Sequence, residues 1–127
     1  MDAVSLFTGC GGMDLGMKAA GATVVLPKLT VVEGDVRNLT RLPEVTLLFG
    51  GYPCQSFSMG GNRAPTNDPR TYLFREFARC LGVIRPKFFI AENVSGLKKI
   101  DGGTFLKEQV EVFEEVTPGY RVSAKVV

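Results

Sequence analysis

Residues 5–16, SLFTGCGGMDLG, place a cluster of glycines between a short apolar run and a helix-like segment. The apolar run at residues 3–7 predicts a buried strand, and residues 12–20 predict a helix. A strand, a glycine-rich turn and a helix in this order are typical of the first unit of an α/β fold. The stretch therefore predicts a mostly parallel sheet that is flanked by helices.

Short apolar runs and amphipathic stretches alternate along the rest of the chain in the same way. Further strands are predicted at residues 23–26, 30–33, 45–49, 87–91 and 120–127. Further helices are predicted at residues 71–83 and 104–116. Runs that are apolar on both faces suit a buried parallel sheet, so the pattern favours one α/β domain.

The helix predicted at residues 71–83 has an apolar stripe that recurs at four-residue intervals from Leu73. Arg75, Glu76 and Arg79 lie off that stripe and are expected to face solvent. Pro86 ends the helix, because proline disfavours the helical conformation of the residue before it.

The composition limits the class of protein. A chain of 127 residues with 45% hydrophobic and 22% charged residues is typical of one globular domain. The net charge of +2 is too small to indicate nucleic-acid binding by itself. No apolar run reaches the roughly 18 residues that span a bilayer, so no membrane role is predicted.

The cysteine and histidine counts limit the chemistry. Three irregularly spaced cysteines predict free thiols in a reducing compartment, either the cytoplasm or, in a eukaryote, the nucleus. The chain has no histidine, which excludes Cys-His and Ser-His-Asp catalysis within it. Metal sites that use histidine are excluded for the same reason, and no metal is predicted.

The glycine-rich turn has two interpretations. Gly9, Gly11 and Gly12 follow the first strand, where a nucleotide-like cofactor can touch the backbone and the N-terminus of a helix. Their spacing differs from G-x-G-x-x-G, which favours a cofactor without a pyrophosphate, such as S-adenosylmethionine. The alternative is a tight turn that needs glycine only for a positive φ. Asp35 likewise either accepts a hydrogen bond from an adenine amino group or is an ordinary turn residue.

Residues 50–58, GGYPCQSFS, hold Cys54 in a turn that follows the apolar run at residues 45–49. A cysteine in such a place is either a half-buried packing residue or a nucleophile at the end of a strand. Pro53 restricts the backbone just before it. The residues of this segment leave both interpretations open.

Five blocks of the sequence together resemble one enzyme family. SLFTGCGGMDLG, EGDV, GGYPCQSFS, DPRTYLF and FFIAENVSGL occur in the order found in cytosine-5 DNA methyltransferases, which transfer a methyl group from S-adenosylmethionine to carbon 5 of cytosine. The resemblance covers the chain from about Val4 onward. It implies a Rossmann-like methyltransferase fold, in which residues 1–127 are part of the catalytic core and stop before the target-recognition region.

The resemblance also implies the residues of the site. Those expected to bind S-adenosylmethionine are Phe7, Gly9, Cys10, Gly11, Gly12, Asp35, Val36, Gly51, Pro53 and Leu73. Those expected to be catalytic are Cys54, Glu92 and Asn93. The family's acidic residue after the second strand, which would bind the ribose, is missing, since residues 27–29 are Pro-Lys-Leu.

The family's chemistry implies a role for each catalytic residue. The Cys54 thiolate adds to carbon 6 of cytosine, which makes carbon 5 nucleophilic enough to take a methyl group. Glu92 binds ring nitrogen 3 and supplies a proton there, and partial burial is expected to favour its protonated form. The alternative for Glu92 is an ordinary N-cap or loop carboxylate. Asn93 either holds the segment that carries Cys54 or satisfies backbone groups at the end of its strand.

The implied substrate is double-stranded DNA in a restriction-modification setting, with the target base flipped out of the helix. The basic residues that either contact phosphates or are simply solvated are Arg63, Arg70, Lys98 and Lys99. Target recognition is expected to come either from a further part of a larger enzyme of which this chain is a fragment or from a second polypeptide. One alternative is an RNA (tRNA) cytosine-5 methyltransferase. The other is a non-catalytic domain that keeps the fold without turnover, which the missing ribose carboxylate favours.

Overall fold

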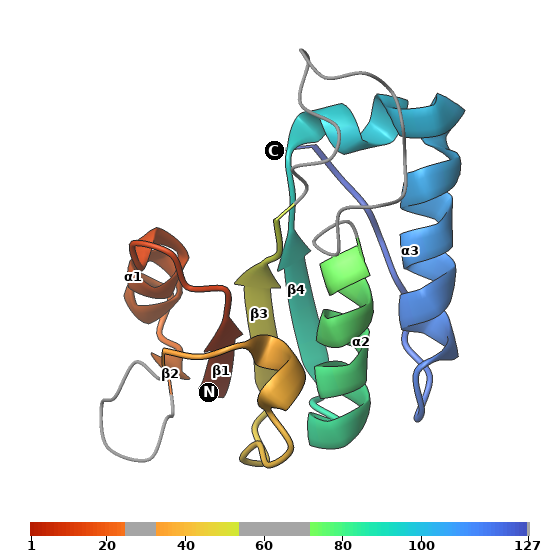
Figure 1. Ribbon diagram of the computed structural model, residues 1–127. Coiled ribbons are helices and arrows are strands. Elements are labelled where there is room, and N and C mark those ends of the chain that lie inside the picture. Colours follow the sequence, from red (N-terminus) through yellow and green to blue (C-terminus); the bar gives the residue numbers. More distant parts are fainter. Residues whose placement is uncertain (25–32, 54–71, 127) are drawn as a thin grey trace.

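The computed structural model of the chain describes residues 1–24, 33–53 and 72–126. Within these residues, one parallel sheet has the strand order β2-β1-β3-β4 (Figure 1). Its strands are β1 (Asp2–Leu6), β2 (Thr23–Val24), β3 (Leu47–Gly51) and β4 (Phe88–Glu92). The helices are α1 (Gly12–Ala19), α2 (Leu73–Ile84) and α3 (Thr104–Glu115), and the 3₁₀ segments are η1 (Val36–Asn38) and η4 (Ser95–Gly103).

The two sides of the sheet carry separate apolar clusters, because alternate residues of a strand face opposite sides. The residues that pack together on the α1 side include Ala3, Leu47, Phe49, Met13 and Met17. The residues that pack together on the α2 side include Val4, Leu6, Leu48, Phe77 and Leu81. Figure 1 shows α2 and α3 on the β3–β4 part of the sheet and α1 beside β1 and β2.

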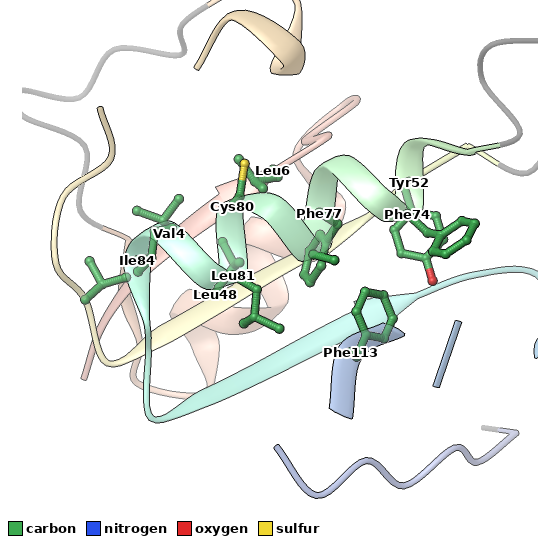
Figure 2. Packing of buried hydrophobic residues seen from close by; sticks show 12 residues of the cluster. Val4, Leu6, Leu48, Tyr52, Phe74, Phe77, Cys80, Leu81, Ile84 and Phe113 are labelled. Carbon is green, nitrogen blue, oxygen red and sulfur yellow. The ribbon is translucent and has the colours of Figure 1, made fainter. Parts of the chain in front are cut away.

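Buried aromatic side chains lie together in one part of the cluster on the α2 side of the sheet (Figure 2). Tyr52, which follows β3, lies with its ring centroid 5.9 Å from that of Phe77 and 6.4 Å from that of Phe113. All three side chains are buried. Since burial of a large apolar side chain contributes about 1.5–3 kcal/mol, this cluster fixes α2 and α3 against the sheet. The cluster lies next to the end of β3, because Tyr52 directly follows that strand.

Most of the predicted elements are confirmed. Strands β1, β3 and β4 and all three helices have bounds within two residues of those predicted. Helix α2 ends before Pro86, with Arg85 in the left-handed region at a φ of 51°. The α/β class with a parallel sheet is therefore correct. None of the helices in the described residues is long and apolar enough to cross a membrane.

Two strand predictions have a different outcome. The prediction of a strand at the C-terminus is wrong, because residues 120–126 form no strand. Tyr120 Oη donates a hydrogen bond to Pro86 O at 2.8 Å, and its ring lies 5.3 Å from that of Phe89, so side chains hold this segment beside β4. The strand predicted at residues 30–33 lies outside the described residues except for Glu33, which is in no strand.

Candidate active site

The ends of β1, β3 and β4 meet at one edge of the sheet, because parallel strands all point the same way. Leu6 at the end of β1 pairs with Gly50, and Gly51 at the end of β3 pairs with Glu92. The segments that follow these strands are therefore neighbours. This edge holds most of the residues that the sequence predicts to be functional.

The segment between β1 and α1 is a tight turn. Phe7, Gly9 and Gly11 have positive φ values of 56°, 52° and 79°. The amide of Gly11 donates to Thr8 O at 2.8 Å, and Gly11 is the N-cap of α1. Glycine adopts such angles without strain, whereas they cost a residue such as Phe7 about 1–3 kcal/mol. The backbone conformation therefore explains Gly9 and Gly11 without any ligand.

Gly12, the first residue of α1, is different. Its φ lies outside the left-handed region, and a Cβ built on it would meet no described atom within 4 Å. Neither the backbone conformation nor the packing of described atoms requires glycine at residue 12. A ligand that approaches the free N–H groups at the start of the helix would require it, because a side chain there would stand in the way. Cys10, in the same turn, is exposed. The N-terminus of α1 is thus open to a ligand.

Cys54 lies outside the described residues, but the segment that leads to it is held on two sides. Tyr52 Oη donates a hydrogen bond to Gln109 Oε1 of α3 at 2.6 Å, and both side chains are buried. Asn93 Nδ2 donates to the carbonyl oxygen of Tyr52 at 3.3 Å, and Asn93 Oδ1 accepts from Val94 N at 2.8 Å. Asn93 therefore makes both kinds of contact that the sequence left open.

The bond between Tyr52 and Gln109 gives a prediction for stability. Tyr52→Phe leaves Gln109 Oε1 buried without this donor, so we expect the free energy of unfolding to fall by about 1–3 kcal/mol. The double variant Tyr52→Phe/Gln109→Leu should recover most of the loss, since replacing both partners by apolar groups is nearly neutral. Urea unfolding followed by circular dichroism measures all three chains. A double variant that is no more stable than Tyr52→Phe would contradict this pairing.

Glu92 is exposed, so the prediction of its partial burial is wrong. Phe88 and Ile90, on the same side of β4, are also exposed, because the cluster on the α1 side does not extend to them. The Glu92 carboxylate nevertheless lies over the end of the neighbouring strand. Its Oε2 is 2.6 Å from the position that a Cβ on Gly51 would take. Glycine at residue 51 thus leaves the space that the carboxylate fills.

Asp35 caps η1 and is paired within its own segment. Its Oδ1 accepts hydrogen bonds from both the backbone N and the Nε of Arg37 at 2.9 Å, and Arg37 Nη2 donates to Oδ2. The side-chain hydrogen bond from Arg37 is the main reason why the pKa of Asp35 falls from 3.8 to about 2. An adenine amino group would have to share this carboxylate with Arg37, which the sequence did not indicate. Val36 packs against the same core cluster as Phe7.

The pair of Asp35 and Arg37 gives a prediction for pH dependence. Arg37→Met should raise the pKa of Asp35 from about 2 towards 3.8. Because the folded-state pKa is lowered, the pair stabilises the fold above the ordinary pKa of aspartate, and this is lost as the pH falls towards the folded value. NMR titration of the Asp35 carboxyl carbon measures the shift, with Arg41→Met as the control. An Asp35 pKa near 3.8 in the unsubstituted chain would contradict the pairing.

Other predicted residues have simpler positions. Leu73 begins α2 and packs against the core cluster, and Pro53 is half-buried. Lys98 and Lys99 are exposed on η4, whereas Arg63 and Arg70 lie outside the described residues. Among the residues that the structure describes, no group of three or more His, Cys, Asp or Glu side chains could hold a metal ion.

Two residues that were not predicted from the sequence contact segments of the candidate site. Gln109 lies on the buried stripe of α3, four residues from both Phe105 and Phe113, so a polar residue at an apolar position was a signal. Arg79 was expected to face solvent, yet its guanidinium contacts the carbonyl oxygens of Val36 and Leu39. No local pattern indicates that contact.

Comparison with known proteins matches one family. The sequence model of the family described as C-5 cytosine-specific DNA methylase matches residues 26–127. The type II methyltransferase M.FnuDI of Fusobacterium nucleatum is 36% identical over 144 aligned residues, which cover 100% of this chain and 41% of that protein. M.PspPI of Psychrobacter sp. (strain TA137) is 39% identical, with 98% and 34% covered. M.Eco47II of Escherichia coli is 41% identical, with 82% and 30% covered. The chain thus spans less than half the length of these relatives.

Proposed function

The chain belongs to the C-5 cytosine-specific DNA methylase family, and we propose that residues 1–127 supply part of the catalytic core of a DNA cytosine-5 methyltransferase. The observation that carries the proposal is the shared edge of the sheet. There the glycine turn follows β1, the segment leading to Cys54 follows β3, and Glu92 and Asn93 lie at the end of β4. Target recognition on duplex DNA comes from polypeptide outside these residues, in the same chain or in a second one.

S-adenosylmethionine is the cofactor of this proposal, and it supplies a methyl group carried on a positively charged sulfur. The residues that would hold it are Phe7, Gly9, Cys10, Gly11, Gly12, Asp35, Val36, Gly51, Pro53 and Leu73. The open N-terminus of α1 at Gly12 supports this assignment, because its backbone N–H groups can receive polar groups of a ligand. Asp35 fits an adenine amino group only if Arg37 gives up part of the carboxylate.

The proposed chemistry assigns the covalent step to Cys54. Its thiolate forms a bond to carbon 6 of the flipped cytosine, and the ring electrons move to carbon 5, which takes the methyl group. Glu92 holds a proton at ring nitrogen 3 while the thiolate adds. A solvent water molecule then takes the carbon 5 proton, and the double bond between carbons 5 and 6 re-forms as the bond to sulfur breaks and the Cys54 thiolate leaves. Asn93 keeps the segment before Cys54 next to β4 through the carbonyl oxygen of Tyr52.

Calorimetric titration with S-adenosylhomocysteine tests the cofactor site. We expect the chain to bind the ligand and Gly12→Ala to weaken binding by about tenfold or more, since a methyl group at the start of α1 would stand between ligand and backbone. The fold should be unchanged, because the added Cβ meets no described atom within 4 Å. Absence of binding at millimolar ligand, or equal binding by a folded Gly12→Ala chain, would overturn the proposed site.

A further inference from the structure

Arg79 of α2 bridges two segments that are far apart in the sequence. Its Nη1 donates to Leu39 O at 2.7 Å, and its Nη2 donates to Val36 O at 2.8 Å. Its Nε donates to Glu76 Oε2 at 2.7 Å, one turn earlier on the same helix. The guanidinium therefore uses all three nitrogens, two of them on the backbone around η1.

The sequence pattern placed Glu76 and Arg79 on a solvent face, and the structure corrects this. Their side chains are only 26% and 34% exposed, whereas Arg75 on the same helix is 53% exposed. The difference arises because residues 33–44 pass next to α2 and cover part of its polar face (Figure 1). A partly covered arginine with three fixed acceptors is held in one orientation, since its planar fork matches them.

Arg79 supplies hydrogen-bond donors to carbonyl oxygens at the C-terminal end of η1. A short 3₁₀ turn leaves carbonyl oxygens without partners at its end. Val36 O accepts from Leu39 N at 3.1 Å, but Leu39 has an extended backbone, so its carbonyl points out of the turn. Arg79 takes both oxygens at once. Among the described residues, Val36, Leu39 and Leu42 also pack against the core cluster that includes α2, and Glu76 of α2 interacts electrostatically with Arg37 of the turn.

We propose that Arg79 is a positioning residue, which fixes the turn carrying Asp35 and Val36 and thereby sets the selectivity of the cofactor site for adenine. The proposal rests on the proposed function, in which Asp35 accepts from the adenine amino group and Val36 also contacts the cofactor. Asp35 is the N-cap of η1, and its side chain accepts from the amide of Arg37 within the turn. A shift of the turn therefore moves the Asp35 carboxylate with it.

The first test measures the turn without any ligand. Asn38 N donates to Asp35 O at 3.0 Å, and Leu39 N donates to Val36 O. In Arg79→Met we expect these two amides to exchange with solvent about tenfold faster or more, as measured by NMR. Arg75→Met, an exposed arginine that pairs with Glu108 across to α3, should leave them unchanged. Unchanged exchange in Arg79→Met would overturn the proposal, whatever the chain binds.

The second test measures base selectivity. The two ligands are S-adenosylhomocysteine and S-inosylhomocysteine, in which a carbonyl oxygen replaces the adenine amino group. The unsubstituted chain and Arg75→Met should bind the first about tenfold or more tightly than the second. In Arg79→Met this ratio should fall to near one, and Arg79→Lys should restore part of it. A merely structural role would weaken both ligands equally and keep the ratio.

The two tests separate this inference from the function on which it rests. If the unsubstituted chain binds neither ligand while its turn amides depend on Arg79, the cofactor site is wrong and so is the selectivity role. If it binds both ligands and a folded Arg79→Met keeps the tenfold ratio, only the inference about Arg79 is wrong. If Arg79→Met fails to fold, Glu76→Gln replaces it in the test. This substitution weakens the hydrogen bond between Arg79 Nε and residue 76, so the ratio of the two affinities should fall to an intermediate value.

Discussion

Gly50→Ala is expected to destabilise the fold by about 3 kcal/mol or more, which is a large part of the total stability of a small domain. A Cβ at this position would lie 2.1 Å from Leu6 O and 3.0 Å from Leu6 C, both of them backbone atoms of β1. Gly50 pairs with Leu6 in the ladder between β1 and β3, so neither atom can move without breaking that ladder. Urea unfolding followed by circular dichroism measures the loss.

Gly16→Ala is the matched control for this substitution. Gly16 lies in α1, is exposed, and would place its Cβ where no described atom lies within 4 Å. Alanine should therefore leave the stability unchanged or raise it by about 0.5–1 kcal/mol, since it favours helix more than glycine does. If Gly50→Ala unfolded at the same urea concentration as the unsubstituted chain, this result would contradict the close contact between β1 and β3 at residue 50.

Glu92→Gln is expected to lower the rate of methyl transfer by about 10²–10⁴-fold, the usual contribution of a general acid. Because Glu92 is exposed, the free energy of unfolding of the Glu92→Gln variant should hardly differ from that of the unsubstituted chain. Gly51→Ala should lower the rate too, since its Cβ would come 2.6 Å from Glu92 Oε2 and push the flexible carboxylate aside. Single-turnover transfer of labelled methyl groups to duplex DNA measures both rates.

The control for Glu92→Gln is Glu111→Gln. Glu111 is an exposed glutamate of α3 that pairs with Lys107 at 3.6 Å and that has no role in the proposed site. Its removal should leave the rate of methyl transfer unchanged. A rate in Glu92→Gln equal to that of Glu111→Gln would show that this carboxylate takes no part in the reaction.

The sheet and helices could be predicted because their signals are local. Buried parallel strands are short apolar runs, and α2 has an apolar stripe with a proline after it. The end of β3 was missed because Gly50 and Gly51 carry no side chain to signal a strand, yet both pair with neighbouring strands. The C-terminal segment was predicted wrongly because its alternating pattern is used for side-chain packing by Tyr120 and Val122.

The candidate site could be predicted only in part, because its supporting contacts join residues that are distant in the sequence. Gln109 reaches Tyr52 over 57 residues, and Arg79 reaches Val36 over 43. Neither partner can be read from a window around the residue itself. The pairing of Asp35 with Arg37 is local, but it depends on the turn that η1 makes. The roles of Cys54 and Glu92 remain predictions.

Covalent trapping on duplex DNA that contains 5-fluorocytosine tests the central proposal most directly. Fluorine at carbon 5 cannot leave as a proton does, so the bond between Cys54 and carbon 6 should persist after methyl transfer from S-adenosylmethionine. We expect an adduct with the mass of chain, DNA and one methyl group, alone or with a polypeptide that supplies target recognition. Cys54→Ser should abolish the adduct, and Cys80→Ala, which changes a buried cysteine of α2 outside the proposed site, should still form it. An adduct that persists in Cys54→Ser, or none in any pairing from a folded chain, would contradict the proposed mechanism.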